Sequence, residues 1–217
     1  PGSTVNQYSF DEYKGYLRVA TTRYDYRNNV DISSVYILNS ELEKVGEVFD
    51  LADDEQVKAV RFMGDTGYVV TFRNTDPLFI LDLSDPANPT VTGELKIPGY
   101  SAYIHPIGND YLVGIGYNGT DEAVDSDSVK VSVFDVSDKT KPVETDTFVI
   151  KKATSLVNSD PKAFFWYSER NLAGIPVSFT GENGNSVKSI QTLEIKDGKI
   201  SADGVKFTVG RIHSKKQ

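Results

Sequence analysis

His105 is the first side chain to consider for acid–base or metal chemistry, because the chain holds only two histidines and no cysteine. Three similar segments elsewhere carry an aromatic residue at the matching place, namely Phe10, Phe62 and Trp166. A shared aromatic position favours a ring that packs in the core or lines a channel over a catalytic base, which needs a nucleophile in reach. The chain also lacks a serine nucleophile elbow, a His-Glu-x-x-His motif and a dinucleotide fingerprint. We therefore treat His105 and Trp166 as candidate ligand-binding residues and name no catalytic residue.

An acidic segment between residues 118 and 127 offers the only evident set of hard-cation ligands. Carboxylate oxygens are the ligands that Ca²⁺ prefers, but this segment lacks the regular spacing and the closing glutamate of an EF-hand loop. We expect a weak Ca²⁺ site at most, with a solvated loop as the favoured interpretation, and no other cofactor. The candidate ligands are Asp121, Glu122, Asp125 and Asp127.

A second candidate surface comes from the connections that follow the second strand of each repeated unit. These connections are long at residues 23–33, 118–127 and 180–186, and short at residues 73–77. The first one carries Tyr24, Tyr26 and Arg27, whose rings and guanidinium suit contact with a carbohydrate or a protein. Variable loops on a rigid scaffold often carry binding residues, although ordinary solvent-facing loops explain the same composition equally well.

Composition bounds the classes of protein to which the chain can belong. It has 217 residues, 39% of them hydrophobic, and its 12 tyrosines and 11 phenylalanines against one methionine favour strands over helices. A net charge of −8 argues against nucleic acid as a partner, because phosphate binding needs clustered lysine and arginine. We find no apolar run long enough for a transmembrane helix and no signal peptide. A chain that starts at Pro1 is expected to have been processed or cut from something longer.

The elements that must position these residues form a fourfold repeat. Similar apolar segments begin at Asn6, Lys58, Ser101 and Lys162, at spacings of 52, 43 and 61 residues, and each opens a unit with four strand patterns. Repeats of this length that contain only strands predict a β-propeller of four-stranded antiparallel blades. Near-continuous apolar runs such as residues 68–72 require sheets buried on both faces, which favours stacked blades over the alternative, a β-sandwich. The predicted blades span about 5–51, 57–97, 101–150 and 160–209, followed by a basic tail or linker at 210–217.

Turns and glycines recur in phase between the units. Asp82-Leu83-Ser84-Asp85 matches residues 135–138, and Pro89 matches Pro142. The stretch 42–52 also has helical spacing, but Gly46 matches Gly93 in the next unit and glycine is costly inside a helix. We therefore predict a strand from Val45 to Leu51.

Several of these segments resemble known families. Residues 79–89, read as Phe-Ile-Leu-Asp-Leu-Ser-Asp-Pro-Ala-Asn-Pro and followed by Gly93, are similar to the LVIVD repeat of bacterial and archaeal cell-surface proteins. Residues 6–22 and 160–177 resemble the secreted β-propeller domain family that is distantly related to WD40 repeats. The resemblance implies an extracellular or surface-anchored protein with a propeller larger than this segment, and it brings no catalytic residues.

Two functions of different classes remain. The favoured one is a non-catalytic extracellular or cell-surface module that binds a protein or glycan through the loops of one propeller face. The alternative is a glycan-active hydrolase or lyase whose carboxylates line the axial channel, so enzymatic activity is undecided and disfavoured. We further expect an open arc of four blades rather than a closed ring. The outer faces of its end blades would be uncovered, and two copies could associate through them as a homodimer.

Overall fold

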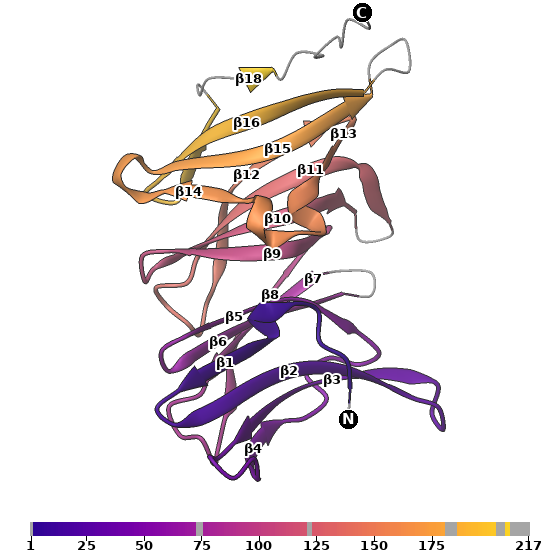
Figure 1. Cartoon of the computed structure of the whole chain (residues 1–217), viewed down its shortest axis with the longest axis vertical. Helices are drawn as coiled ribbons and strands as arrows, with labels where there is room; N and C mark the ends of the chain where they lie inside the picture. The colour runs from indigo at the N-terminus through magenta and orange to yellow at the C-terminus, as the bar shows by residue number, and fades with distance from the viewer. Residues whose placement is uncertain (1, 73–75, 121–122, 181–185, 203–206, 209–217) are drawn as a thin grey trace, which may run out of the picture.

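The chain folds into four antiparallel sheets, as the computed structural model shows for residues 2–72, 76–120, 123–180, 186–202 and 207–208. Among these residues there is no α-helix, and helical structure is limited to four 3₁₀ turns of three residues each. The sheets follow one another along the long axis, and the first and last lie at opposite ends (Figure 1). This arrangement confirms the predicted all-β propeller blades and their open, unclosed arc. The predicted basic tail, residues 210–217, lies outside the described residues.

Each of the first three blades is a four-stranded meander whose strands pair in chain order. Blade one contains β1 (Phe10–Tyr13), β2 (Tyr16–Asp25), β3 (Val30–Leu38) and β4 (Lys44–Val48). Blade two contains β5 (Gln56–Met63), β6 (Thr66–Phe72), β7 (Asp76–Asp82) and β8 (Thr90–Ile97). Blade three contains β9 (Tyr100–Ile107), β10 (Tyr111–Gly119), β11 (Val124–Asp135) and β12 (Val143–Lys151).

Blade four is less regular. It contains β13 (Ala153–Ser155), β14 (Phe165–Tyr167), β15 (Leu172–Thr180), β16 (Ser186–Lys196), β17 (Lys199–Ser201) and β18 (Phe207–Thr208). Both β13 and β14 pair with β15, so two short pieces share the place of a single innermost strand. Between them lie the 3₁₀ turns η2 (Leu156–Asn158) and η3 (Pro161–Ala163), and η4 (Ser168–Arg170) follows β14. The fourth sheet therefore begins at Ala153, earlier than residue 160, where the repeat placed the start of the blade.

Two local predictions meet different outcomes. The stretch with helical spacing is a strand, β4, over Lys44–Val48, which confirms the strand interpretation and shortens it. The apolar segment that begins at Asn6 opens the first unit with a strand pattern, but Gln7–Ser9 form the 3₁₀ turn η1. The turn forms because the Asn6 side chain accepts a hydrogen bond from the Tyr8 backbone N–H at 2.9 Å, an alternative to strand pairing that asparagine favours.

The hydrophobic core lies between blades rather than inside any one of them. One cluster joins blades one and two, for example through Val35 and Val69. Another joins blades two and three, for example through Tyr68 and Leu112. A third cluster of buried residues joins blades three and four. Neighbouring residues on one strand, such as Tyr68 and Val69, thus enter different clusters, which confirms that the apolar runs are buried on both faces.

A repeated close approach fixes each blade against the next. The outermost strand of blade one passes so close to the β7–β8 turn that a Cβ on Gly46 would lie 2.1 Å from the carbonyl oxygen of Pro86. The same contact recurs one blade later, where a Cβ on Gly93 would lie 2.1 Å from the carbonyl oxygen of Lys139. Only glycine fits such a contact without a backbone shift, so the matched glycines of the repeat mark matched joints between blades.

The third joint replaces the glycine with a hydrogen bond. Thr145 of β12 donates from Oγ1 to the carbonyl oxygen of Gly198 at 2.7 Å, and Gly198 lies in the tight β16–β17 turn of blade four. Asp146 supports this joint by accepting a hydrogen bond from the Ile200 backbone N–H at 2.9 Å. All three joints therefore dock the turn before the outermost strand of one blade onto the outermost strand of its predecessor.

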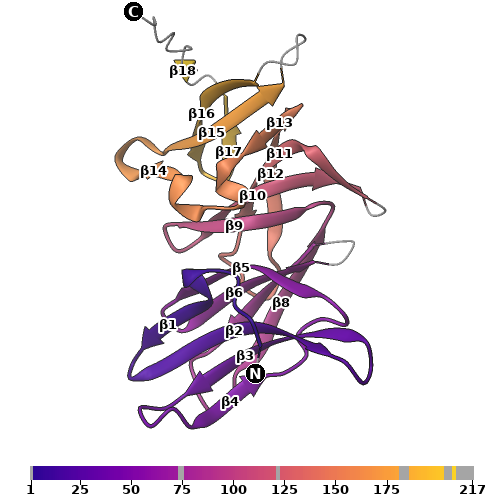
Figure 2. The same ribbon diagram turned by 45° about the vertical axis from the view of Figure 1, so that its right-hand side comes forward.

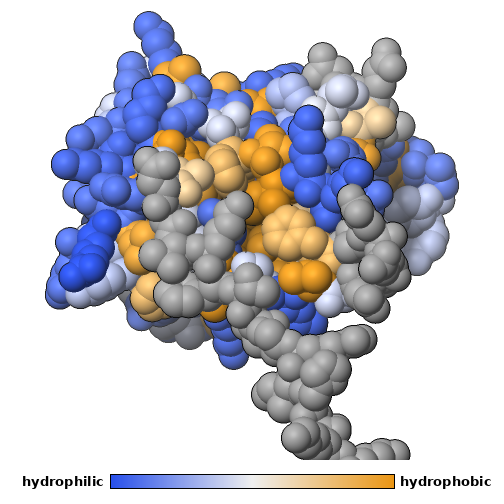
Figure 3. Space-filling view, turned by 90° about the horizontal axis from the view of Figure 1, so that it is seen from above, coloured by the Kyte–Doolittle hydropathy of each residue, from blue (hydrophilic) through white to orange (hydrophobic). Residues whose placement is uncertain are grey.

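The outer face of blade four is apolar and lies at the end of the arc. Viewed from above, hydrophobic side chains gather across this end (Figure 3). Phe165 is 57% exposed, and a hollow of about 310 Å³ is lined by Ala163, Phe165, Leu172, Ala173, Gly174, Pro176, Ile190 and Thr192. At the opposite end, the outer face of blade one is more polar, because Arg23, Lys44 and Glu47 lie beside Phe49.

Candidate functional site

The three loop residues of blade one gather on a hairpin tip rather than in a long loop. Strands β2 and β3 pair down to Asp25 and Val30, so most of the predicted loop is regular hairpin. The rings of Tyr24 and Tyr26 meet edge to face with centroids 5.0 Å apart, and Tyr26 is 89% exposed. The Tyr24 hydroxyl donates to Asn29, and Arg27 is exposed beside them. The structure therefore brings these candidates together as an exposed aromatic and cationic tip.

The acidic segment of blade three also belongs to a hairpin, formed by β10 and β11. Asp125 pairs with Asn118 across this hairpin, and its Oδ1 accepts the Asp127 backbone N–H at 3.0 Å. The other two predicted calcium ligands, Asp121 and Glu122, lie outside the described residues. Within the described part of the chain, no three histidine, aspartate or glutamate side chains lie close enough to hold a metal. The weak Ca²⁺ site stays a prediction.

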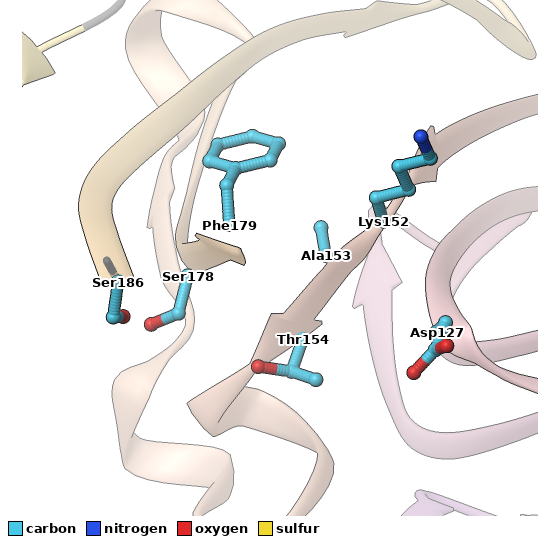
Figure 4. Close-up of a pocket in the computed structure, with 7 residues that line it drawn as sticks. All are labelled: Asp127, Lys152, Ala153, Thr154, Ser178, Phe179 and Ser186. Carbon is cyan, nitrogen blue, oxygen red and sulfur yellow. The ribbon is translucent and has the colours of Figure 1, made fainter. Parts of the chain in front are cut away.

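A pocket opens between blades three and four beside this acidic hairpin (Figure 4). Its volume is about 420 Å³, within the usual range for small-molecule sites. It is lined by Asp127, Lys152, Ala153, Thr154, Ser178, Phe179 and Ser186, and we call it the inter-blade pocket. The lining combines hydroxyl groups, one carboxylate and one amine with a single phenylalanine ring, so it offers hydrogen-bonding groups for a polar ligand and one apolar surface for packing. The repeat pattern missed this pocket because Lys152 and Thr154 lie outside the predicted strands.

The ends of the β2–β3, β10–β11 and β15–β16 hairpins lie on the same side of the arc, to the right in both ribbon views (Figure 2). The links between consecutive blades emerge on this side as well. We call it the loop face. The inter-blade pocket belongs to it, because Asp127, Ser178 and Ser186 stand near the tips of two of these hairpins.

His105 and Trp166 belong to a different place, at the innermost edge of the blades. The His105 ring lies 4.9 Å from the Phe164 ring and 6.2 Å from the Trp166 ring, measured between centroids. Its Nδ1 is 3.0 Å from the Tyr103 hydroxyl. Phe164 belongs to the apolar segment that begins at Lys162 and that the repeat predicts as a strand, but in the structure it ends the 3₁₀ turn η3, whose N-cap is Asp160. The structure thus brings these two candidates together, apart from the hairpin tip of blade one.

Arg61 is the residue of this region that sequence reasoning missed. Its guanidinium carbon lies 3.8 Å from the centroid of the Tyr8 ring and 5.6 Å from that of Tyr103. Nη2 donates to the Tyr103 hydroxyl at 3.0 Å and to the Ile104 carbonyl at 3.3 Å. The available signal was a single arginine inside the apolar segment that opens blade two. We call Tyr8, Arg61, Tyr103, His105, Phe164 and Trp166 the axial cluster, to which every blade contributes.

Burial controls the protonation of this cluster. Desolvation, reinforced by the Arg61 charge, lowers the pKa of His105 to about 4, so the imidazole is neutral near pH 7. Desolvation also raises the pKa of Tyr103 to about 12, an effect that the Arg61 charge opposes. A neutral tyrosine beside a neutral histidine can donate a hydrogen bond to the imidazole.

Carboxylates contribute little to the innermost strands. Among the described residues of β1, β5, β9 and β14, only Asp11 and Glu12 are acidic. Asp11 pairs with Arg18, a buried side chain that also donates to the Gly64 carbonyl of the next blade. Glu12 accepts the Gly15 backbone N–H at 3.0 Å. Both are held in local structure, so they offer no pair of free carboxylates for acid–base chemistry.

The four antiparallel blades, their joints and the inward cluster define a β-propeller segment. A family model described as β-propeller domain matches residues 1–215, and the chain belongs to that family. An uncharacterized protein of Methanocaldococcus jannaschii is 44% identical over 176 residues, which are 81% of this chain and 27% of that protein. One from Archaeoglobus fulgidus is 44% identical over 184 residues, again 27% of its length. The chain therefore spans about a quarter of the length of these relatives.

Solved structures agree on the fold. The acylaminoacyl peptidase of Pyrococcus horikoshii matches 91% of this chain and 32% of its own, with a TM-score of 0.53 and 12% identity. Sqt1 from Chaetomium thermophilum matches 90% of this chain and 47% of its own, with a TM-score of 0.56 and 11% identity. At these identities the likeness concerns the fold alone. In the described part of the chain, no helix has the length and apolar character needed to span a membrane.

Proposed function

We propose that this chain is a non-catalytic binding module of an extracellular or cell-surface protein, and that it recognises its ligand through the loop face. A propeller domain supports a binding or scaffold role in general, and the ligand class and location are the proposed parts. The inter-blade pocket carries the proposal. It is a concave site on the face where the sequence placed the binding loops.

The lining of the pocket favours a glycan over a protein segment. Thr154, Ser178 and Ser186 offer hydroxyl groups, while Asp127 and Lys152 offer an acceptor and a donor of opposite charge. Phe179 supplies one ring against which a sugar can pack. A protein ligand would be expected to use the exposed tip with Tyr26 instead, because exposed aromatic residues are enriched in protein interfaces.

A glycan array probed with the labelled chain tests this proposal. We expect selective binding that Lys152→Asn weakens at least about tenfold, since a hydrogen bond to a charged group is lost. Asparagine is chosen because Lys152 has a φ of 53°, a conformation that asparagine tolerates. Lys151→Asn is the matched control, one residue away on β12 and outside the pocket lining. No selective glycan, or equal binding by both variants, would overturn the proposed site.

The location can be tested separately in cells of the source organism. A membrane-impermeant amine reagent should label the protein on intact cells, because the chain exposes many lysines. Labelling only after lysis would contradict an extracellular or surface location.

The apolar outer face of blade four must be covered by a further protein surface. We propose that a further blade of the same polypeptide covers it, because the chain spans 27% of the length of its relatives and each interior blade face is already covered in this way. Association of two copies, the homodimer considered from the sequence, is the other way to bury Phe165 and Ile190.

Light scattering and a dye that fluoresces on apolar surfaces separate these two possibilities. A monomer at micromolar concentration whose dye binding drops in Phe165→Ser supports a further blade as the natural cover. A stable dimer that Phe165→Ser dissociates would establish the second copy and overturn the further-blade proposal.

A further inference from the structure

The axial cluster contains a cation without a counter-ion. Among the described residues, no carboxylate lies within ion-pair distance of Arg61. Its Nε is buried and has no hydrogen-bond partner, and Nη1 donates to none of the described residues. A buried donor without an acceptor costs free energy and needs a structural or functional reason. Stacking on Tyr8 offsets only part of that cost.

The hydrogen bonds of the cluster make it a set of donors. Arg61 Nη2 donates to the Tyr103 hydroxyl, so that oxygen accepts from Arg61 and its own proton is free to go to His105 Nδ1. We assign Nδ1 as the acceptor of the Tyr103 proton on the basis of the Arg61 contact, and with this assignment the neutral imidazole carries its own proton on Nε2. His105 Nε2 has no partner among the described residues. Arg61, through Nε and Nη1, and His105, through Nε2, therefore present N–H groups that have no acceptor among the described residues.

Aromatic rings frame these donors. Tyr8 and Phe164 lie on either side of Tyr103, with centroids 5.8 Å and 5.5 Å from its ring, and Trp166 lies beside His105. Tyr8, Phe164 and Trp166 are each partly accessible. N–H donors that lie beside partly accessible aromatic rings suit a ligand with a small anionic group on a ring that can pack against them.

We propose that the axial cluster binds a carboxylate attached to a six-membered ring, such as a hexuronate sugar with an apolar C–H face or an aromatic acid, with Arg61 and His105 donating to the carboxylate. The planar guanidinium matches the geometry of a carboxylate. A single positive charge balances a monoanion, whereas a phosphate dianion would leave a negative charge in a partly buried site of a chain with a net charge of −8. This site lies at the inner edge of the blades and is separate from the loop face.

Trp166 reports ligand binding directly by NMR. It is the only tryptophan of the chain, so the ¹H–¹⁵N spectrum contains a single indole N–H signal. The uniformly ¹⁵N-labelled chain is titrated with glucuronate and with benzoate. Glucose and benzamide serve as the uncharged counterparts. We expect at least one acid to shift the Trp166 signal saturably, at concentrations below about 10 mM, and its uncharged counterpart to leave the signal in place.

Variants of β5 test the role of Arg61. Arg61→Met should weaken acid binding by about tenfold to a hundredfold, since it removes a charge-assisted hydrogen bond. Lys58→Met, a nearby loss of charge on the same strand, should leave binding unchanged. Arg61→Lys keeps the charge without the planar guanidinium and should weaken acid binding by a smaller factor than Arg61→Met. This variant keeps the proposal testable if the methionine variant does not fold.

Each outcome decides the proposal. A shift with glucuronate alone identifies a sugar acid as the ligand class, and a shift with benzoate alone identifies an aromatic acid. The proposal is overturned if neither acid produces a saturable shift, if the uncharged counterparts bind equally well, or if both Arg61 variants bind like the unaltered chain. Glycan binding at the inter-blade pocket should persist in these variants, which keeps the two sites distinguishable.

Discussion

Replacing Gly93 by alanine should destabilise the joint between blades two and three. The added Cβ would lie 2.1 Å from the Lys139 carbonyl oxygen and 3.1 Å from the Pro142 ring, whereas ordinary contact begins at 3.4 Å. The β11–β12 turn must therefore retreat by about 1 Å, and overpacking of this kind typically costs about 1–3 kcal/mol. Alanine recovers about 0.5–1 kcal/mol in a strand. We expect a net loss of about 1 kcal/mol, or about 2–4 °C in Tm for a chain of this size.

Urea unfolding followed by circular dichroism measures this loss, with an expected midpoint decrease of about 0.5 M. Gly46→Ala should behave alike, because its Cβ would meet the Pro86 carbonyl oxygen at the same 2.1 Å. Gly174→Ala is the control, since its nearest neighbour is a Phe165 ring carbon at 3.5 Å. A Gly93→Ala variant as stable as Gly174→Ala would refute the view that close backbone approach defines the joints.

Three further predictions concern charged and titrating groups. An NMR titration should give His105 a midpoint near 4, because burial and, second, the Arg61 charge favour the neutral ring. The stability that the neutral ring contributes is present above the unfolded pKa of about 6.5 and is lost as the pH falls toward 4. A midpoint near 6.5 would contradict this prediction. Arg18→Met should cost about 2 kcal/mol in urea unfolding, because buried charged hydrogen bonds are lost. Lys14→Met, at an exposed ion pair, should cost clearly less, and equal costs would count against the argument. Hydrogen bonds from the Thr140 side chain and backbone lower the pKa of Asp138, so the stability that they add is present above about pH 4 and is lost below it. Asp138→Asn should therefore reduce the loss of stability that the chain shows on acidification. An unchanged loss on acidification would exclude this turn as a contributor.

The blades could be predicted from the sequence because their signals are local. Apolar runs and turn residues repeat within each unit. The match of Gly46 with Gly93 excluded a helix in the sequence, and the structure adds that both glycines lie at joints between blades. The split inner strand of blade four was missed, although Asp160 before Pro161 is a recognisable start of a helical turn. The repeat pattern was weighted more heavily than this local cap.

The axial cluster could be predicted only in part, since its members come from all four blades. His105 and Trp166 stood out by their aromatic alignment. Arg61 did not, because a lone arginine in an apolar segment reveals its partner only when Tyr8 is folded over it. The inter-blade pocket was predicted only in part: Asp127 and Ser186 lie in connections that the sequence marked as binding loops, whereas Lys152 and Thr154 lie between the predicted blades, where no repeat signal points to them.

The position of the core between blades has a consequence for how the chain unfolds. Each interior blade has a neighbour on both sides, while blade one and blade four have a single neighbour within the arc. In such an array, stability is set mainly by nearest-neighbour interfaces. Backbone amides of β6 and β10 should therefore exchange with solvent most slowly, and those of the two end blades should exchange first. A blade excised from the array would lack the surface that completes its core, so the smallest cooperative unit of this chain is a pair of blades.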